Sequence, residues 1–475
     1  TLGRLRLATK GLLRSGPGEP LRLTSADEQL AQGMYMIGQV AALHDQPLTL
    51  AELHRNVTAD ALAWLERGQA AAAARQLPDG PADIAIIGIG VWLPGATDRR
   101  AYWTNLANGV ACLREVPPER WDWRLYYDAD PATRDRVYAR WGGFIAEQPF
   151  DPTRYGLPPV ALKSVDPLQL LALETVRQAL DDADLALDRV DRERIAVVLG
   201  ASGGMGELGL AYAARADLPR LVGRVEEEVL ARLPEWTEDS FAGLLPNVAA
   251  GRVSNRFDFG GVNCAVDAAC ASSLAAVYQG VNELRLGHSD LVIAGGVDTM
   301  QSPFMYLCFA KTQALSPQGR PRTFDERADG IAIAEGVAAV VLKRLEEAER
   351  DGDRIYAVIK GIAGSSDGRA KGLTAPRPVG QLRALRRAYR AAGYSPVTVG
   401  LWEAHGTGTV AGDRAELETV TTLLAETGAA PASGAIGSVK TLIGHTKATA
   451  GVAGLIKAAL ALHYRVLPPH RGVSQ

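Results

Sequence analysis

The feature that most constrains the fold of this chain is a series of short, unbroken apolar runs. The first run is Ile84–Gly88, and similar runs occur at 195–200, 291–296, 338–342, 356–361 and 399–404. An apolar run without polar alternation is typical of a strand that is covered on both faces of a sheet. Stretches with helical spacing separate the runs, at 166–184, 270–286 and 381–392. This alternation predicts an α/β fold built on a largely parallel sheet.

The first 66 residues differ from the rest of the chain. A capping signal at Ser25–Glu28 precedes apolar residues at helical spacing over 29–43, and a second helical pattern covers 51–65. An alanine run and the cluster Leu77–Pro81 follow, and such proline and glycine clusters are typical of linkers. We therefore predict a helical N-terminal segment over 1–66, a linker over 67–82 and a main α/β domain over 83–475.

Composition and charge argue against several classes of protein. Lys and Arg number 51 against 54 for Asp and Glu, so the formal charge of -3 predicts no nucleic-acid or anionic-membrane partner. The longest apolar stretch, 451–462, contains Lys457 and is too short to cross a bilayer. The chain opens at Thr1 without a signal peptide, from which we expect a cytoplasmic protein. Four cysteines without a CxxC pair predict neither a metal site nor a disulfide framework.

Three other patterns are weaker signals. Gly204–Gly209 matches GxGxxG, but Pro219 interrupts the segment after it, and we interpret the match as a surface loop. Gly364–Gly368 matches GxSxG, but a nucleophile elbow needs a helix directly after it, and here an extended, proline-containing segment comes next. Arginines at 383, 386, 387 and 390 indicate a solvated helix face, with docking of an acidic carrier protein as the alternative.

Cys270 is the candidate nucleophile. It lies in the segment 264–274, CAVDAACASSL, where an apolar stretch meets a helix of small residues. A helix start offers unpaired N–H groups and a positive dipole end, which lower the pKa of a thiol and prepare a site for an anion. Cys264 precedes this turn and lacks that support. The alternative is that Cys270 is a small buried apolar residue, as free cysteines usually are.

Two histidines favour the catalytic interpretation of Cys270. His405 follows an apolar run and precedes Gly406, and His445 follows Gly444. Histidines on loops bounded by glycine are better placed to meet a ligand than to pack in a core. One cysteine with two such histidines indicates acyl transfer through a thioester.

At this point the sequence resembles the β-ketoacyl synthase (ketosynthase) domain of type I polyketide and polyunsaturated fatty acid synthases. The resemblance runs from about Asp83 to Gln475, and its motifs stand in the family's order. They are IAIIGIGVWLP at 84–94, DPLQ at 166–169, VDAACASSL at 266–274, FDERADG at 324–330, EG at 335–336, EAHGTGT at 403–409, GDRAE at 412–416 and SVKTLIGH at 438–445. The phrases YGLPP at 155–159 and GLTAPRP at 372–378 are more similar to the iterative branch that makes polyunsaturated fatty acids, glycolipids or enediynes.

The resemblance implies a thiolase fold, which is a five-layer α-β-α-β-α sandwich, preceded here by the small helical segment. It implies a catalytic triad of Cys270, His405 and His445. It also implies that Thr407 and Thr409 contact phosphopantetheine, and that Lys440, Asp413 and Glu416 form a charged layer behind the triad. The implied reaction is a decarboxylative Claisen condensation of a Cys-bound acyl chain with malonyl-acyl carrier protein.

The same resemblance implies the cofactors and partners. The domain itself binds no metal or redox cofactor, and phosphopantetheine arrives on the acyl carrier protein. The implied partners are that carrier protein, adjacent acyltransferase or other synthase domains, and a second copy in a homodimer. The stretch Gly33–Leu50 is similar to the C-terminal tail of flavin-dependent enoyl reductases, and a helical docking or linker segment is the alternative.

The chain departs from the family pattern at three places. Ala271 stands where serine is common, and Thr441–Leu442 where Ser-Asn is usual. The family's C-terminal Gly-Phe-Gly loop, which gates the site and supplies an oxyanion donor, does not occur up to Gln475. We expect a chain that ended there to be inactive. A non-elongating ketosynthase-like partner therefore stays an alternative, as does a thiolase-type acyltransferase, although the second cysteine that a thiolase needs is not evident.

Overall fold

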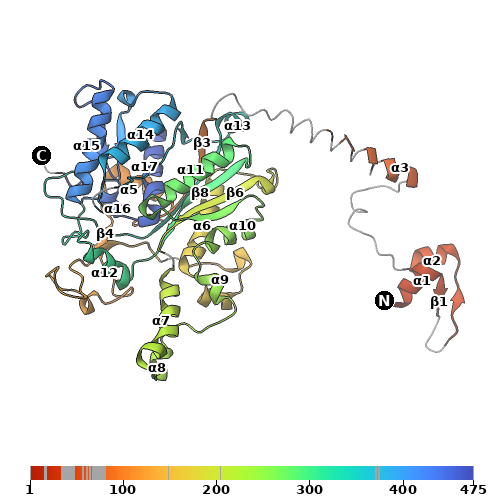
Figure 1. The fold of residues 1–475 in the computed structure, drawn as a ribbon. Helices are drawn as coiled ribbons and strands as arrows, with labels where there is room; N and C mark the ends of the chain where they lie inside the picture. The colour runs from red at the N-terminus through yellow and green to blue at the C-terminus, as the bar shows by residue number, and fades with distance from the viewer. Residues whose placement is uncertain are drawn as a thin grey trace. The chain divides into compact units, whose positions relative to one another are not determined.

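The computed structural model describes residues 2–14, 19–33, 49–55, 58–59, 62–63, 66, 82–147, 149–203, 205–369, 372 and 375–473. They belong to two compact units, Thr1–Gln76 and Leu77–Gln475, which are described separately (Figure 1). Except for Ala82, the predicted linker lies outside the described residues, and so do residues 34–48 of the stretch that is similar to enoyl reductase tails.

The N-terminal unit contains helices and one small hairpin. Its elements are α1 (Leu2–Lys10), β1 (Leu12–Leu13), β2 (Arg22–Leu23), α2 (Ala26–Gln32) and α3 (Leu50–Arg55), and β1 and β2 pair antiparallel. The predicted cap is present, since the Ser25 hydroxyl accepts a hydrogen bond of 3.2 Å from the Glu28 N–H. Helix α2, which covers the start of the helix predicted over 29–43, ends at Gln32, where Gly33 has an extended backbone, and residues 34–43 of that prediction lie outside the described residues. Much of the helix predicted over 51–65 lies outside the described residues beyond Arg55.

A six-stranded sheet forms the centre of the second unit. Its order is β10 (Ala357–Ile359), β3 (Ile84–Trp92), β9 (Gly336–Arg344), β8 (Leu291–Asp298), β6 (Ile195–Ala201) and β7 (Asn263–Val266). Five of the predicted runs are strands of this sheet. The prediction of a largely parallel sheet is wrong, because β6 pairs in parallel with β7 and β8 while the other three pairings are antiparallel. A strand buried on both faces has the same apolar run in either direction, so the sequence pattern does not encode its direction.

Helices cover both faces of this sheet. Alternate side chains of a strand point to opposite faces. Ile84 and Ile86 accordingly pack in the core beneath α11 (Ser272–Arg285) and α17 (Ala450–Tyr464). Ala85 and Ile87 pack instead in the core beneath α6 (Pro167–Asp182) and α10 (Val248–Phe257).

A second, smaller sheet lies beyond α17. It consists of β11 (Leu401–Glu403) and β12 (Ala435–Gly437), which pair in parallel. Helices α14 (Pro378–Ala392) and α15 (Val410–Glu426) pack together on its other side, where the Tyr389 ring of α14 lies 5.9 Å from the Trp402 ring of β11. The order α6/α10, main sheet, α11/α17, small sheet, α14/α15 is the predicted five-layer α-β-α-β-α sandwich (Figure 1).

The remaining elements lie around these layers. They are α5 (Arg99–Asn108), β4 (Leu113–Glu115) and its antiparallel partner β5 (Trp141–Gly143), α7 (Glu207–Val222), α8 (Glu227–Leu230), α9 (Ser240–Leu244), α12 (Pro303–Lys311), α13 (Leu345–Asp351) and α16 (Lys440–Ile443). Within the described ranges, no helix has both the length and the apolar character needed to cross a membrane.

Two paired glycines let loops approach the middle of the main sheet. Gly200 of β6 lies opposite Gly296 of β8. A methyl group on Gly200 would lie 2.4 Å from backbone atoms of Ser272 and Ser273, and one on Gly296 would lie 2.8 Å from the Cα of Thr449. Glycine is therefore required at both positions for the start of α11 and the turn before α17 to reach the sheet.

Candidate active site

A tight turn between β7 and α11 positions Cys270. The Asp267 carboxylate accepts a hydrogen bond of 2.9 Å from the Ala269 N–H. The Ser272 hydroxyl accepts one of 2.9 Å from the Ala268 N–H and donates one of 2.6 Å to the Ala269 carbonyl. Residues Ala269–Ala271 form a single 3-10 turn that leads directly into α11. Cys270 thus lies immediately before a helix start, as the sequence predicts.

The turn stores backbone strain next to the thiol. Ala269 has φ of 51°, in the left-handed region that residues with a Cβ rarely enter. That conformation costs roughly 1–2 kcal/mol. Strain of this kind persists where surrounding contacts hold it, and it is frequent at functional sites. The hydrogen bonds of Asp267 and Ser272 are such contacts.

The thiol of Cys270 is held largely in its neutral form. Burial raises its pKa, while the charges of Lys440 and Lys447 lower it and Asp298 raises it further. The net shift is upward, so the expectation that the helix start lowers the pKa does not hold for the resting site. Desolvation of a thiolate outweighs the favourable charges here. A neighbouring group must therefore accept the thiol proton when the sulfur attacks.

His445 has a fixed tautomer. Its backbone N–H donates to the Ala332 carbonyl at 2.8 Å, and its carbonyl accepts from the Ala334 N–H at 2.9 Å. Its ring Nδ1 accepts a hydrogen bond of 2.9 Å from the Lys447 N–H. Burial, together with the nearby charges of Lys440 and Lys447, holds the pKa of His445 well below its usual value. A neutral ring whose Nδ1 is an acceptor carries its proton on Nε2, so His445 presents an N–H donor.

His405 lies beside His445, from a different element. The two rings are 5.3 Å apart between centroids, with an angle of 86° between their planes. The Glu416 carboxylate of α15 fixes the loop after β11, because it accepts from the N–H groups of His405 and Gly406 at 2.6 and 2.7 Å. His405 keeps a solvent-accessible surface. Desolvation, with the charge of Lys440, lowers the pKa of His405 to about 3.

Lys440 supplies positive charge to all three members of the predicted triad. Its side chain is almost fully buried at the start of α16. Burial lowers its pKa, and the carboxylates of Glu403 and Glu416 oppose that shift. The charge of Lys440 lowers the pKa values of Cys270 and both histidines. The structure therefore gathers all three residues around one ammonium group.

The threonine loop lies between His405 and α15. The hydroxyls of Thr407 and Thr409 are 2.9 Å apart, and both residues are half-buried. Asp413, in the first turn of α15, accepts from the Gly408 N–H at 3.1 Å and from the Phe324 N–H at 2.7 Å. Asp413 thus ties the threonine loop to the segment that contains the FDERADG motif.

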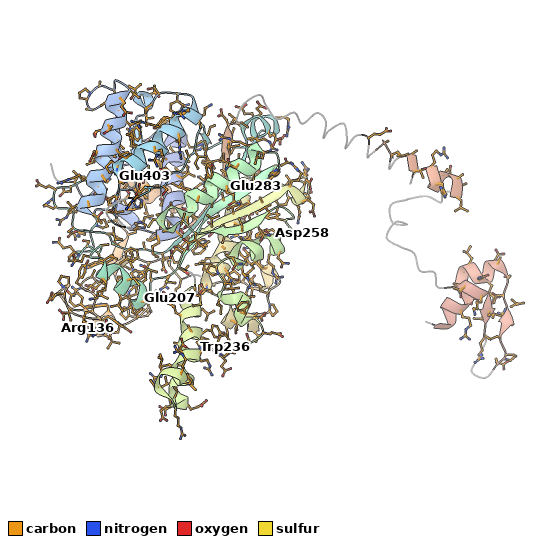
Figure 2. The ribbon with its side chains drawn as sticks, viewed as in Figure 1. Arg136, Glu207, Trp236, Asp258, Glu283 and Glu403 are labelled. Atoms are coloured by element: carbon orange, nitrogen blue, oxygen red, sulfur yellow. The ribbon has the colours of Figure 1, made fainter. Side chains whose placement is uncertain are left out.

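Four charged residues near the site were missed at the sequence level: Asp298, Glu403, Lys447 and Lys457. Lys457 of α17 pairs with Glu403 at 2.5 Å, and Glu403 also accepts from the Val439 N–H at 2.7 Å, next to Lys440 (Figure 2 labels Glu403). Lys447 pairs with Asp298 at 3.1 Å. A signal was available for Lys457, since a lysine within an apolar helix indicates a buried partner.

The weaker motifs have structural roles. Helix α7 begins at Glu207, inside the GxGxxG match, and continues through Pro219, so the interpretation of the match as a surface loop that Pro219 interrupts is wrong. The Asp166 carboxylate lies against Gly206, the residue before the helix. That carboxylate takes the place an anionic phosphate would need. No helix follows the GxSxG match until α14 in the described part of the chain. Among the described residues, no cluster of His, Cys, Asp or Glu is suited to hold a metal ion.

The arginine face of α14 is exposed, as predicted. Arg386 pairs with Glu426 of α15. Arg383 and Arg387 donate to carbonyls of Ser366 and Gly364 in the loop before the helix. These contacts fix the loop before α14 and give most of the arginines on this face a partner within the chain, so the arginine face does not require a partner protein.

Comparison with known proteins identifies the family. The model of the β-ketoacyl synthase N-terminal domain matches residues 82–348, and that of the β-ketoacyl synthase C-terminal domain matches residues 356–474. The chain belongs to the β-ketoacyl synthase family. A ketosynthase is an acyltransferase that forms carbon–carbon bonds in chain elongation, and this is the activity that the two family domains imply.

Individual relatives agree with this assignment. The chain is 42% identical over 415 residues, 83% of its length, to a polyunsaturated fatty acid synthase subunit of Thraustochytrium sp., of which that match covers 15%. It is 40% identical over 393 residues, 82% of its length, to polyketide synthase ThaG of Burkholderia thailandensis, of which the match covers 7%. The chain thus spans a small part of these curated relatives. Neither relative is a thiolase, so the thiolase-type alternative is not favoured.

Solved structures show the same fold. The oxazolomycin ketosynthase domain OzmH KS7 of Streptomyces albus matches with a TM-score of 0.74 at 36% identity, over 83% of this chain and 65% of that one. The ketosynthase from module 6 of the bacillaene synthase of Bacillus subtilis matches with a TM-score of 0.72 at 32% identity, over 83% of this chain and 63% of that one. The predicted thiolase fold is confirmed.

Proposed function

We propose that Cys270, His405 and His445 carry out a decarboxylative Claisen condensation between an acyl chain and malonyl-acyl carrier protein. The observation that carries this proposal is the pair of neutral imidazoles 5.3 Å apart, one of them with its proton fixed on Nε2. A neutral imidazole N–H can donate a hydrogen bond to the negative charge that develops on a thioester oxygen, and its protonation state does not have to change first.

In the first half-reaction, the sulfur of Cys270 attacks the thioester carbonyl of the acyl carrier. The thiol proton passes to a histidine and then to the departing phosphopantetheine sulfur. The new thioester stores the acyl chain on the enzyme. The N–H of Cys270 lies near its own sulfur, where it can donate to the developing oxyanion.

In the second half-reaction, the N–H groups of His405 and His445 donate to the thioester carbonyl of the malonyl carrier. Loss of CO₂ leaves an enolate on that oxygen, and the two donors stabilise its charge. The enolate carbon attacks the acyl carbonyl on Cys270, the C–S bond breaks, and the thiolate takes up a proton. The product is a β-ketoacyl chain on the carrier.

We assign binding of the phosphopantetheine arm to Thr407 and Thr409. Their neighbouring hydroxyls lie two and four residues from His405, and their loop is held by Asp413. An arm of amides and hydroxyls needs such polar partners along its length. This assignment makes the acyl carrier protein the partner, with an acyltransferase or other synthase domain to load it.

We propose that the reaction elongates a chain in a polyketide or polyunsaturated fatty acid pathway, which are the classes that the relatives' names give. We also propose a cytoplasmic location. The mechanism needs a free thiol, all four cysteines are free, and reducing compartments maintain that state. The boundaries we propose are a helical segment over 1–66, a linker over 67–82 and the ketosynthase domain over 83–475.

We propose a homodimer that forms through β7. This strand ends the main sheet, so one of its edges has no strand beside it within the described residues. Val262 before the strand, and Leu274 and Tyr278 on α11, are exposed nearby. An edge strand flanked by exposed apolar residues is suited to pair with a second copy. Sedimentation at micromolar concentration should show a dimer, and a single 50.5 kDa species would contradict the proposal.

The experiment that tests the histidine roles separates the two half-reactions. In a protein that carries the family's C-terminal Gly-Phe-Gly loop, His405→Ala and His445→Ala should still acylate Cys270, more slowly, because the other histidine, the helix start and Lys440 remain. Both should release labelled CO₂ from malonyl-carrier protein about a hundredfold more slowly or worse, the usual scale for one positioned donor. His288→Ala is the matched control, since His288 is exposed and beside Glu283. Release of CO₂ at the parent rate by either site variant would remove that histidine from the mechanism.

A further inference from the structure

One buried ion pair near the site has no role in the mechanism above. The side chains of Lys447 and Asp298 are 4% and 3% exposed, and their charged groups are 3.1 Å apart. The Lys447 ammonium also donates to the Ala334 carbonyl at 2.6 Å. Burying two charges is costly, and hydrophobic residues often replace such a pair without loss of stability. Stability alone is therefore a weak reason for this pair.

The backbone of Lys447 is in an unfavourable conformation. Its φ of 46° lies in the left-handed region, which a lysine enters at a cost. In this conformation its N–H donates to Nδ1 of His445 at 2.9 Å. The hydrogen bond that fixes the tautomer of His445 thus depends on the position of one strained peptide group.

Asp298 holds that peptide from two directions. One carboxylate oxygen binds the Lys447 ammonium and accepts from the Met300 N–H at 3.1 Å. The other oxygen accepts from the Ala448 N–H at 3.4 Å. Asp298 itself ends β8, a central strand of the main sheet. The ion pair therefore connects the sheet to the side chain of Lys447 and to the peptide that follows it.

We infer that Asp298 and Lys447 are positioning residues, which aim the Lys447 N–H at Nδ1 of His445 and so keep the proton of His445 on Nε2. Neither side chain needs to touch a substrate for this role. The inference rests on the proposed donor role of His445 and deepens it. It also assigns a second effect to the pair, because both charges act on the thiol of Cys270.

The two charges affect Cys270 in opposite directions. The ammonium of Lys447 lowers the pKa of the thiol, and the carboxylate of Asp298 raises it. The third charged group that acts on this thiol is Lys440, which lowers the pKa and is unchanged in the variants below. Opposite shifts in the two single variants would show that both charges reach the thiol, whereas the tautomer of His445 and the release of CO₂ report the positioning role.

The test compares Lys447→Met, Asp298→Asn, the double variant and Lys447→Arg. The rate of iodoacetamide alkylation of Cys270 is measured by mass spectrometry across a pH series. The pH at which this rate rises should be higher in Lys447→Met and lower in Asp298→Asn than in the parent. Release of CO₂ from malonyl-carrier protein should fall in both single variants by about tenfold to a hundredfold, the usual scale for residues that orient a functional histidine. Lys447→Arg keeps the charge and should recover most of the activity.

Lys343→Met is the matched control. Lys343 pairs with Asp351 and Asp353 at 2.7 and 2.6 Å, is similarly buried, and belongs to β9 rather than to the site. Lys343→Met should be less stable than the parent. The pH dependence of Cys270 alkylation should stay the same, and so should the rate of CO₂ release per folded molecule. If Lys447→Met does not fold, Asp298→Asn and the double variant give the same comparison, since the double variant leaves no unpaired charge.

Nitrogen-15 shifts of labelled histidine rings report the tautomer without any turnover. The His445 signals, identified by their loss in His445→Ala, should show Nδ1 unprotonated in the parent and a mixture of tautomers in Lys447→Met. Shifts of the alkylation profile in the same direction in both single variants, or an unchanged tautomer with parent-like CO₂ release, would overturn the inference. A parent protein that carries the C-terminal Gly-Phe-Gly loop and still alkylates elsewhere or releases no CO₂ would instead overturn the proposed function, and the ring shifts would still decide the positioning role.

Discussion

The buried pair between Lys457 and Glu403 offers a quantitative test of how the site is held. Lys457→Met keeps the length of the side chain and removes its charge. The Glu403 carboxylate then remains buried, with the Val439 N–H still donating to it, because its side chain is 10% exposed and that of Lys457 is 3% exposed. Removing one partner of such a pair typically costs about 3–5 kcal/mol.

This free energy converts to a measurable change in melting temperature. At about 2.1 cal/mol/K per residue, a unit the size of Leu77–Gln475 has an unfolding entropy of roughly 0.8 kcal/mol/K. The Tm of Lys457→Met should therefore fall by about 4–6 °C. The double variant Lys457→Met, Glu403→Gln should recover most of the loss, because the glutamine amide oxygen can still accept from the Val439 N–H and Glu416 still compensates the charge of Lys440.

The assay is calorimetric unfolding of the parent, both single variants and the double variant. Arg386→Met is the control, because the Arg386–Glu426 pair is exposed at 50% and 40% and such pairs contribute at most about 1 kcal/mol. A Lys457→Met variant as stable as Arg386→Met would refute the reasoning. So would a double variant no more stable than Lys457→Met, because the stranded charge would then not be the cause.

Three further predictions concern packing, pH and domain boundaries. Gly200→Ala should destabilise the domain by about 1–3 kcal/mol or more and slow Cys270 acylation, because the new methyl group would lie 2.4 Å from backbone atoms. Gly251→Ala in α10 is the control and should be tolerated, because its methyl group would lie 3.5 Å from the Asn263 side chain. Equal effects of the two substitutions on the melting temperature and on acylation would contradict this prediction. The pKa of His405 is lowered to about 3 and that of His445 lies well below its usual value, so both rings stay neutral as the pH falls from about 8 to about 5. The rate of CO₂ release should therefore show no histidine titration in this range. A loss of rate with an apparent pKa near 6.5 would count against neutral donors. Removal of residues 1–66 should leave a cooperatively unfolding domain, and loss of that cooperativity would refute the proposed boundary.

The sequence predicted the strands better than their directions. Continuous apolar runs identified β3, β6, β8, β9 and β10, because burial on both faces demands such runs. The antiparallel placement of β9 between β3 and β8 depends on how distant segments return to the sheet, and no local pattern carries that information. The start of α14 was predicted too late. The helix begins at Pro378 rather than at Gln381, because proline is favoured in the first turn of a helix.

The reacting residues were easier to predict than the residues that hold them. Cys270, His405 and His445 stand in motifs whose order resembles a known family, and the structure gathers them around Lys440. Lys447 and Asp298 lie 149 positions apart and become partners through the fold alone. The raised pKa of the Cys270 thiol was also not predictable, because it depends on burial by surrounding elements rather than on the local helix start.

The most direct test of the central claim is intact-mass measurement after incubation with an acyl-carrier protein. The parent should gain the mass of one acyl group, and so should Cys264→Ala and Cys308→Ala, whose sulfurs lie in β7 and α12 rather than in the turn before α11. Cys270→Ala should gain none, because Cys270 is the thiol in the turn before α11 whose pKa the charge of Lys440 lowers. An acyl adduct that persists in Cys270→Ala would contradict the assignment of the nucleophile and, with it, the proposed mechanism.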